Sequence, residues 1–268
     1  MSSTTSLDAP AARERVTNKL EFTDLEKRFG GVQVFRNVTF GVPAGSITAL
    51  IGPNGAGKTT LINLACGVFP ATGGTLLKDG RSLAGMKPSQ ARSFGLARTF
   101  QDVRVFPTMT VLENVMVAFP EQPGDKPWLL YGGAWRKVEA ANRTEAMSLL
   151  ERLGLAGDAD RRADEIPFGS QKLLGLARAT ATGADTLMLD ETTTGLAISR
   201  VPTVLDFLRT LKSAGRTILL IEHNMDVVTD VADQVVVLHG TVIASGTPLA
   251  VLHDPQVIRD YLGRIYDA

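Results

Sequence analysis

Residues 52–60 read GPNGAGKTT and match the pattern G-x-x-x-x-G-K-[ST], with Lys58 and Thr59 at its fixed polar positions. The apolar run 47–51 (ITALI) precedes this loop, and the run 60–65 (TLINLA) can begin a helix. Backbone N–H groups of such a loop surround a phosphate chain, and the helix N-terminus adds the positive end of its dipole. Lys58 would bridge the outer phosphates and the Thr59 hydroxyl would bind Mg²⁺. The stretch therefore predicts a binding site for a nucleoside triphosphate.

The charge balance, the apolar stretches and the cysteine count limit the classes of protein to which the chain can belong. The chain has 268 residues, and its 28 Lys plus Arg equal its 28 Asp plus Glu, so the formal net charge is zero. This balance gives no support for nucleic acid as a partner. No apolar stretch approaches the ~20 residues that span a bilayer, and residues 1–19 lack the apolar core of a signal peptide. We expect a flexible tail over 1–19, a cytosolic chain, and a buried Cys66 that, as the single cysteine, forms no internal disulfide.

Three stretches of different character follow the tail. Short β-like runs between residues 20 and 42 predict a small antiparallel sheet. Residues 102–182, approximately, show mostly helical patterns, and strand and helix patterns alternate again over 183–268. The sequence thus predicts an α/β core over 20–101 and 183–268, with an antiparallel β subdomain and an inserted α-helical subdomain over about 102–182.

Two adjacent carboxylates follow one of the predicted parallel strands. The apolar run 186–189 (TLML) leads directly into Asp190 and Glu191. Beside a phosphate loop, Asp190 can bind Mg²⁺ and Glu191 can polarise the water that attacks the terminal phosphate. Without that loop, a carboxylate pair at a strand end is as often a solvated turn or a helix cap. The combination favours a catalytic site.

Two further polar residues are candidates for the site, one after a predicted strand and one where the core meets the helical stretch. The second buried run, 217–221, leads into Glu222 and His223, and a histidine there can contact the terminal phosphate as donor or acceptor. Gln101 lies where the core meets the helical stretch, and an amide can orient water and Mg²⁺ without adding charge. Either residue alone is more often structural. Their positions relative to the Asp190-Glu191 strand favour the functional interpretation.

The order of the motifs GPNGAGKTT, ARTFQ, FGSQK, LMLDE and IEHNMD resembles the ATP-binding cassette (ABC) ATPases, from about Leu20 to the C-terminus. The resemblance implies a P-loop NTPase (RecA-like) core. Within the family, the stretches GLARTFQDVRVFPTMTVLENVMVA, LLIEHNMDVV and DPQVIRDYLG look most like the ATPase subunits of branched-chain amino-acid importers. The resemblance therefore implies transport-coupled hydrolysis of ATP with Mg²⁺.

The resemblance also implies a role for each candidate residue. Phe29 takes the place of the aromatic ring that stacks on adenine, the alternative being an ordinary core Phe at a strand end. Gln101 would link Mg²⁺ to the helical subdomain, Glu191 would be the general base, and His223 would be the switch. The residues expected to wrap the phosphates are Asn54, Gly55, Ala56, Gly57, Lys58, Thr59 and Thr60. The residues expected at the metal are Thr59, Gln101 and Asp190.

In this family two cassettes face each other, and each ATP lies between the phosphate loop of one chain and the signature motif of the other. The implied partners are transmembrane permease subunits, a second ATPase subunit in a homo- or heterodimer, and indirectly an extracytoplasmic solute-binding protein. The implied location is the cytoplasmic face of the inner or plasma membrane. Val105, Phe106 and Met109 are candidates for the permease contact, with packing beneath the helical subdomain as the alternative.

Two positions depart from the family pattern. Pro167 stands where a serine would bond the terminal phosphate of the opposing ATP, and proline has neither a hydroxyl nor a backbone N–H. Gly169 and Ser170 remain as candidate contacts with that ATP. Ala197 replaces a polar side chain near the attacking water, which is expected to weaken communication between the two sites.

These departures leave two functions open. The first is an ATP hydrolase that couples dimer closure to the import of branched-chain or other hydrophobic amino acids. The alternative is a nucleotide-binding, weakly hydrolysing half of a heterodimeric cassette pair. A cassette ATPase of DNA repair or translation usually carries long coiled-coil inserts or two cassettes, and neither is found in this sequence. We predict the transport ATPase.

Overall fold

The computed structural model describes residues 17–99, 104–120 and 134–262. Gln101 and most of the predicted tail lie outside the described residues. The first strand, β1 (Asn18–Phe29), begins two residues before the domain start predicted at Leu20. Lys19 belongs to this strand, where its carbonyl accepts the Asp79 N–H at 3.1 Å, and its ammonium group also pairs with Asp79 at 3.0 Å and with Asp185 at 2.8 Å.

The core of the molecule is a six-stranded sheet in the order β10-β9-β3-β8-β7-β6. Its strands are β3 (Ile47–Ile51), β6 (Leu96–Arg98), β7 (Thr186–Asp190), β8 (Thr217–Ile221), β9 (Gln234–Leu238) and β10 (Val242–Gly246). The first five strands of this sheet by chain order pair in parallel. Only β10 pairs antiparallel with its neighbour, across a hairpin at His239-Gly240-Thr241. Every residue of β3, β7 and β8 is buried, as strands covered on both faces require.

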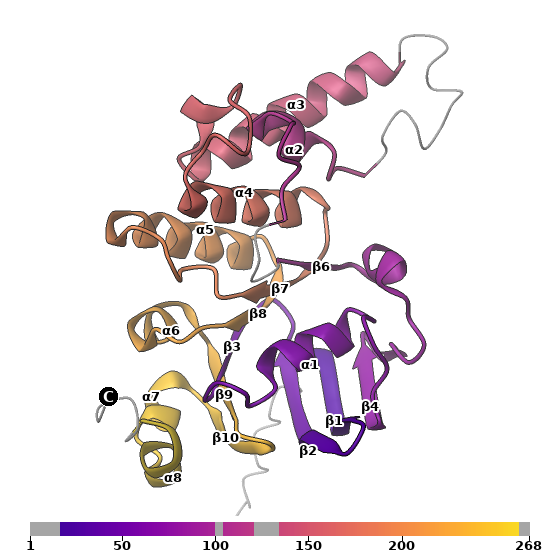
Figure 1. Cartoon of the computed structure of the whole chain (residues 1–268), viewed down its shortest axis with the longest axis vertical. Helices are drawn as coiled ribbons and strands as arrows, with labels where there is room; N and C mark the ends of the chain where they lie inside the picture. The colour runs from indigo at the N-terminus through magenta and orange to yellow at the C-terminus, as the bar shows by residue number, and fades with distance from the viewer. Residues whose placement is uncertain (1–16, 100–103, 121–133, 263–268) are drawn as a thin grey trace, which may run out of the picture.

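Helices cover both faces of this sheet (Figure 1). Alternate side chains of a strand point to opposite faces and therefore pack against different helices. Leu187 and Leu189 of β7 pack in a cluster with α4 (Phe168–Ala181) and α5 (Val201–Ser213). Met188, between them, packs in a second cluster with α1 (Lys58–Ala65). The C-terminal helices complete the cover beside β9 and β10. They are α6 (Met225–Val231), α7 (Pro248–Leu252), α8 (Pro255–Val257) and a final turn at 258–262.

The predicted antiparallel sheet is confirmed as a four-stranded sheet in the order β2-β1-β4-β5. The remaining strands are β2 (Val32–Pro43), β4 (Gly73–Lys78) and β5 (Arg81–Ser82). Phe22 and Phe40 stack across β1 and β2 with their ring centroids 4.3 Å apart. Leu61 and Ile62 of α1 share one buried cluster with these rings, so α1 lies between the two sheets. The phosphate-loop helix is thereby fixed from both sides.

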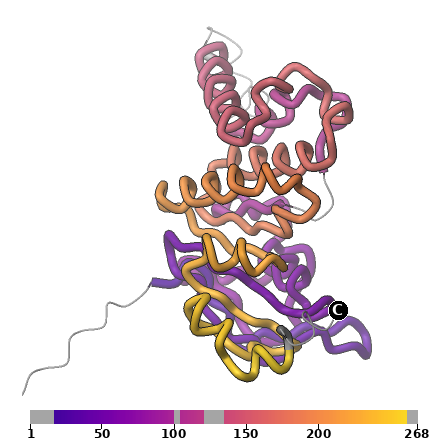
Figure 2. The backbone as a smooth tube through the Cα atoms, turned by 90° about the vertical axis from the view of Figure 1, so that its left-hand side faces the viewer, coloured from indigo at the N-terminus to yellow at the C-terminus, as the bar shows by residue number. Residues whose placement is uncertain are grey.

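The helical part forms the end of the molecule opposite β10 and α8 (Figures 1 and 2). It contains α2 (Val111–Met116), α3 (Ala134–Arg152) and α4. Thr110 caps α2, its hydroxyl accepting the Glu113 N–H while the Glu113 carboxylate accepts the Thr110 N–H. None of the described helices is long and apolar enough to cross a lipid bilayer.

Cys66 follows α1 and is buried, as the sequence predicts. Its Sγ lies 3.5 Å from the Met188 Sδ, so the thiol packs against β7. Burial raises the pKa of the Cys66 thiol to about 11, although the positive charge of Arg98 opposes the rise. A thiol in this environment is a neutral packing group.

This pKa predicts a pH-dependent stability. The thiol ionises near pH 9.0 in the unfolded chain but only near 11 in the folded one, so the stability that it contributes is present below pH 9.0 and is lost as the pH rises through this window. We expect the free energy of unfolding of the wild type, relative to Cys66→Ala, to fall by about 2 to 3 kcal/mol across the window. Urea denaturation of both proteins at either end of the window measures this. A difference that does not change with pH would contradict the assignment.

Candidate functional site

The phosphate loop joins the buried strand β3 to the start of α1, and close packing explains its glycines. A Cβ on Gly52 would lie 2.0 Å from the Leu238 carbonyl oxygen of β9. A Cβ on Gly57 would lie 2.7 Å from the Phe35 ring, and Gly57 has a φ of 96°. The neighbouring strands therefore leave space only for bare backbone at these two positions. This is the tight strand-to-helix turn that the motif predicts.

Lys58 is the first residue of α1 and is buried, 6% exposed. Its Nζ donates to the carbonyl oxygens of Gly52, at 2.7 Å, and Pro53, at 3.0 Å, and so lies along its own loop. Burial lowers the pKa of Lys58, and the charges of Glu191 and Asp190 oppose that fall. The structure thus brings the lysine of the first motif within the field of both predicted carboxylates.

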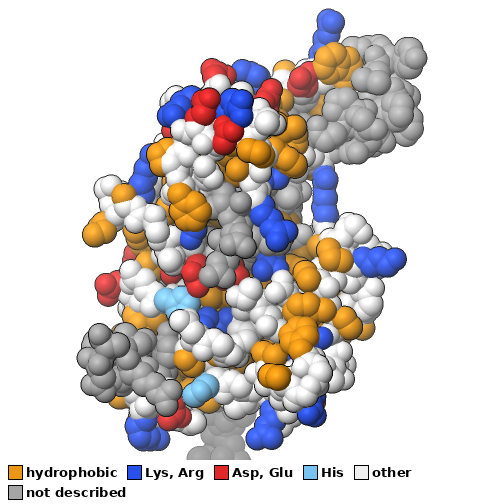
Figure 3. Space-filling view, viewed as in Figure 1, with side chains coloured by type: hydrophobic (Ala, Val, Ile, Leu, Met, Phe, Trp, Pro, Cys, Tyr) orange, Lys and Arg blue, Asp and Glu red, His pale blue; other side chains and the backbone are white. Residues whose placement is uncertain are grey.

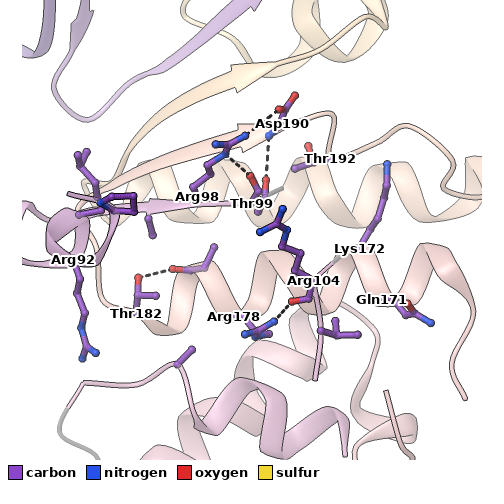
Figure 4. Close-up of a pocket in the computed structure, with 18 of the residues that line it drawn as sticks. Arg92, Arg98, Thr99, Arg104, Gln171, Lys172, Arg178, Thr182, Asp190 and Thr192 are labelled. Carbon is purple, nitrogen blue, oxygen red and sulfur yellow. Dashed lines mark hydrogen bonds and ion pairs between the residues drawn. The ribbon is translucent and has the colours of Figure 1, made fainter. Parts of the chain in front are cut away.

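Asp190 ends β7 and is the least satisfied acid of the site. Its side chain is 1% exposed, and neither carboxylate oxygen accepts a well-formed hydrogen bond among the described residues, although the Thr59 hydroxyl lies near enough to lower the pKa of Asp190. The nearest paired cation is Arg98 of β6, with 3.8 Å between Nη2 and Oδ2, and the Asp190 N–H donates to the Thr99 hydroxyl at 3.0 Å (Figure 4). Burial raises the pKa of Asp190, while Arg98 and Lys58 act to lower it and Glu191 to raise it.

Two buried carboxylate oxygens without well-formed hydrogen bonds suit a divalent cation, which prefers oxygen ligands. The described residues contain no group of three or more His, Cys, Asp and Glu side chains that could enclose a metal. Mg²⁺ is commonly held by one or two carboxylates together with phosphates and water. The donor set therefore fits a metal that arrives with a phosphate ligand.

Glu191 and His223 form the second pair of the site. The His223 Nε2 lies 3.1 Å from the Glu191 Oε1, and the two side chains are 34% and 18% exposed respectively. Glu191 has a φ of 49°, in the left-handed region that non-glycine residues seldom adopt. Its N–H donates to the Ile221 carbonyl of β8 at 3.0 Å, which helps to hold this conformation. The two residues predicted from separate strands are thus in contact.

Phe29 ends β1 and is 46% exposed as a residue, so the alternative of an ordinary buried core residue is wrong. The ring meets Phe69 edge to face, with centroids 5.1 Å apart, and the Lys27 Nζ lies 4.5 Å from its centroid. Lys27 is itself held by the Pro70 carbonyl at 2.7 Å. The exposed ring is therefore fixed in place and free to stack on a planar ligand.

The signature residues lie at the start of α4 rather than beside the phosphate loop. Pro167 and Phe168 are exposed, Gly169 is half-buried, and Ser170 is buried at 8% exposure. A Cβ on Gly169 would lie 3.2 Å from the Leu196 side chain, so α4 packs closely on the segment that follows Glu191. The start of this helix presents polar backbone on the surface of the same chain.

The candidate permease contact is only partly exposed. Phe106 is 45% exposed and lies 4.7 Å from the Arg178 guanidinium. Val105 packs against the core cluster, and Met109 is half-buried. Figure 3 shows exposed apolar side chains over both the β-sheet part and the helical part of one face, among charges of both signs. A cavity of about 530 Å³ lies beside Phe106, and Arg98, Lys172 and Asp190 are among its lining residues (Figure 4).

Sequence reasoning missed several residues that shape the site. Arg98 was visible inside the ARTFQ motif, and Glu222 directly before His223, but neither received a role. Lys172 is the last residue of the FGSQK motif and also received no role. The partners of Lys172 and Thr193 lie 19 or more residues away along the chain. The Lys172 Nζ donates to the Glu191 and Thr194 carbonyls at 3.3 and 2.7 Å.

Comparison with known proteins decides the family. The family description ABC transporter matches residues 35–194. The high-affinity branched-chain amino acid transport ATP-binding protein LivG of Salmonella typhimurium is 40% identical over 248 residues, covering 91% of this chain and 97% of LivG. The chain belongs to the ABC transporter family. BraF of Pseudomonas aeruginosa, with the same description as LivG, is 36% identical over 91% of this chain and 97% of BraF.

Solved structures agree with this membership of the ABC family. A nucleotide-free ATP-binding cassette from an ABC transporter matches with a TM-score of 0.78 and 32% identity, covering 91% of this chain and 99% of the other. An ATP-binding cassette in its ADP conformation matches equally well, covering 92% of this chain. The fold predicted from the motifs, a P-loop NTPase core with added antiparallel and helical parts, is confirmed.

The environment of Asp190 predicts that the nucleotide-free ABC chain is destabilised by this acid. Its pKa is raised above the ordinary 3.8, so the stability that it contributes below pH 3.8 is lost as the pH rises through the folded-state pKa. We expect Asp190→Asn to raise the free energy of unfolding by about 1 kcal/mol at pH 7, with no gain near pH 4. Thermal denaturation at both pH values measures this.

Asp185→Asn is the matched control with the opposite sign. Burial acts to raise the pKa of Asp185, but hydrogen bonds from Lys19 and Lys78 bring it below its ordinary value. Its loss is expected to destabilise the chain at pH 7. An Asp190→Asn protein that is also less stable than the wild type at pH 7 would contradict the account of Asp190.

Proposed function

We propose that the chain is the ATP-binding and ATP-hydrolysing subunit of a membrane importer for branched-chain or other hydrophobic amino acids. The relatives quoted above carry that transport role in their names and match over 91% of the chain. One structural observation supports hydrolysis most directly, the 3.1 Å contact of Glu191 with His223 beside Lys58 and Asp190. ATP-driven closure of two cassettes would supply the work of transport.

Phe29 would stack on the adenine ring, since its half-exposed face is fixed by Lys27 and Phe69. The phosphates would be wrapped by the loop that Gly52 and Gly57 shape. The loop residues in this role are Asn54, Gly55, Ala56, Gly57, Lys58, Thr59 and Thr60. Among the described residues Lys58 donates only to neutral carbonyls, and an entering phosphate would give its ammonium group a charged hydrogen-bond acceptor in direct contact.

Thr59 and Asp190 would hold Mg²⁺, and the buried oxygens of Asp190, without well-formed hydrogen bonds, support this role. When bound, the metal would neutralise charge that develops on the outer phosphates. Gln101 would be the third contact. It lies outside the described residues, so its role rests on the ARTFQ motif alone.

Glu191 would accept a proton from the attacking water, as a general base needs to be within hydrogen-bond reach of that water. The His223 Nε2, 3.1 Å from its carboxylate, would keep Glu191 oriented and contact the terminal phosphate. Both side chains are partly exposed, which leaves room for the water. His223 would then report the presence of that phosphate to α6, which starts two residues later.

The partner across the nucleotide would be a second cassette. Gly169 and Ser170, at the start of α4, would face the opposing ATP through helix-start N–H groups. Ser170 is only 8% exposed, so its hydroxyl would reach that ATP only after a shift of the first turn. Transmembrane permease subunits, an extracytoplasmic solute-binding protein and a position on the cytoplasmic face of the membrane complete the proposal.

The test uses the purified chain with and without its membrane partners. We expect Glu191→Gln to lower ATP turnover by about 100-fold or more while ATP still binds, since loss of a general base removes chemistry rather than affinity. Glu151→Gln, an exposed change on α3, is the control and should leave turnover unchanged. Leucine uptake into vesicles with the permease subunits tests the solute class.

Wild-type turnover no higher than that of Glu191→Gln would contradict the proposed ATP hydrolase. It would favour the alternative, a weakly hydrolysing half of a heterodimer. Hydrolysis without stimulated uptake of any hydrophobic amino acid would leave the ATPase intact but overturn the solute class.

A further inference from the structure

Glu222 is a carboxylate with no exposure at all, between the last residue of β8 and His223. Its Oε1 accepts both the N–H of Thr193, at 3.0 Å, and the Thr193 hydroxyl, at 2.7 Å. Its Oε2 accepts the N–H of His223 at 3.2 Å. One buried side chain thereby joins two segments that are 30 residues apart in the sequence, 193 against 223.

The two segments are the ones that carry the catalytic pair. Thr193 lies two residues after Glu191, and His223 is the next residue after Glu222. A buried carboxylate is costly to the fold unless donors satisfy it, and hydrogen bonds to a charged acceptor are stronger than neutral ones. Three donors from these two segments meet that requirement. Loosening either segment would leave Glu222 unsatisfied, so the arrangement resists movement.

The segment after Glu191 needs such a restraint, because Glu191 adopts a φ of 49°. A strained residue persists only where the surrounding structure holds it in place. Lys172 of α4 holds the same segment from the other side through the carbonyls of Glu191 and Thr194, and Figure 4 shows its side chain rising from α4 toward Thr192. Glu222 supplies the restraint on the sheet side.

We propose that Glu222 is a positioning residue for the Glu191–His223 pair, acting through Thr193. The inference rests on the proposed hydrolysis for its effect on rate, but its geometric content is independent of activity. Both carboxylate oxygens of Glu222 are occupied by donors of Thr193 and His223, so its role is to hold these two segments. It keeps the Glu191 carboxylate within 3.1 Å of the His223 Nε2 by fixing both backbones to one side chain.

The most informative change is Thr193→Val, which removes one hydroxyl from the clamp and keeps the shape of the side chain and the backbone N–H. Thr193→Ser restores the hydroxyl. Thr217→Val is the matched control, because Thr217 is also buried and its hydroxyl accepts the Gly45 N–H at 2.9 Å, but it begins β8 at the end away from His223. Glu222→Gln is a second variant that exchanges one acceptor for a donor facing the His223 N–H.

Two measurements are needed. Steady-state kinetics separate kcat from the KM for ATP. Imidazole signals in ¹H–¹³C spectra of the nucleotide-free chain report the surroundings of His223 without any turnover. The chain has three histidines, so a His223→Gln protein is sufficient to assign its signal.

We expect Thr193→Val to lower kcat by about 10- to 100-fold with KM within about twofold, because small displacements of a catalytic group reduce the rate steeply. The His223 signal should shift, Thr193→Ser should restore both properties, and Thr217→Val should change neither. Glu222→Gln should act at least as strongly as Thr193→Val if it folds.

The proposal is overturned if Thr193→Val leaves kcat and the His223 signal unchanged, or if Thr217→Val reproduces its effects, which would indicate general loosening. If the wild type does not hydrolyse ATP, the proposed function has failed, and the His223 signal alone decides the positioning role.

Discussion

The parallel register of β3, β8 and β7 is the constraint on which the site depends. Leu50 pairs with Ile221, and Ile221 pairs with Asp190, so the three strands end at one edge of the sheet. Parallel strands present the segments that follow them on the same side, where open α/β sheets bind their ligands. The phosphate loop, the Asp190-Glu191 pair and the Glu222-His223 pair therefore converge, although Glu191 and His223 are 32 residues apart along the chain and the phosphate loop lies farther away still.

Three charged side chains at this edge, those of Lys58, Glu222 and Asp190, are buried, and they differ in how their polar atoms are satisfied. Lys58 is satisfied by two carbonyl oxygens of its own loop, and Glu222 by three donors from two segments. Asp190 is buried with no well-formed hydrogen bond to either oxygen among the described residues, although the Thr59 hydroxyl lies nearby. Structural acids in a core are normally hydrogen-bonded, so the unsatisfied one marks the position where a cation is expected. The unsatisfied Asp190 carboxylate lowers the stability of the ligand-free chain, and binding of a cation there would restore it.

Local patterns in the sequence were sufficient to predict the buried parallel strands and several residues of the candidate site. The apolar runs before the phosphate loop, Asp190 and Glu222 each predicted a buried parallel strand, because such strands carry no polar alternation. Phe29, Glu191 and His223 could be named from motif positions. The roles of Thr193 and Lys172 could not, since each depends on a partner brought near by the fold. The burial of Ser170 was equally invisible, because it follows from how α4 packs on Leu196 rather than from the residues around it.

ATP binding at the strand edge is the central claim, and isothermal titration of ATP into Lys58→Ala and wild-type chains measures it. Lys137→Ala, an exposed change on α3, is the control. Loss of a charged hydrogen-bond donor to phosphate predicts affinity about 10- to 100-fold weaker for Lys58→Ala and unchanged affinity for Lys137→Ala. Equal ATP affinity in the wild-type and Lys58→Ala chains would contradict the central claim.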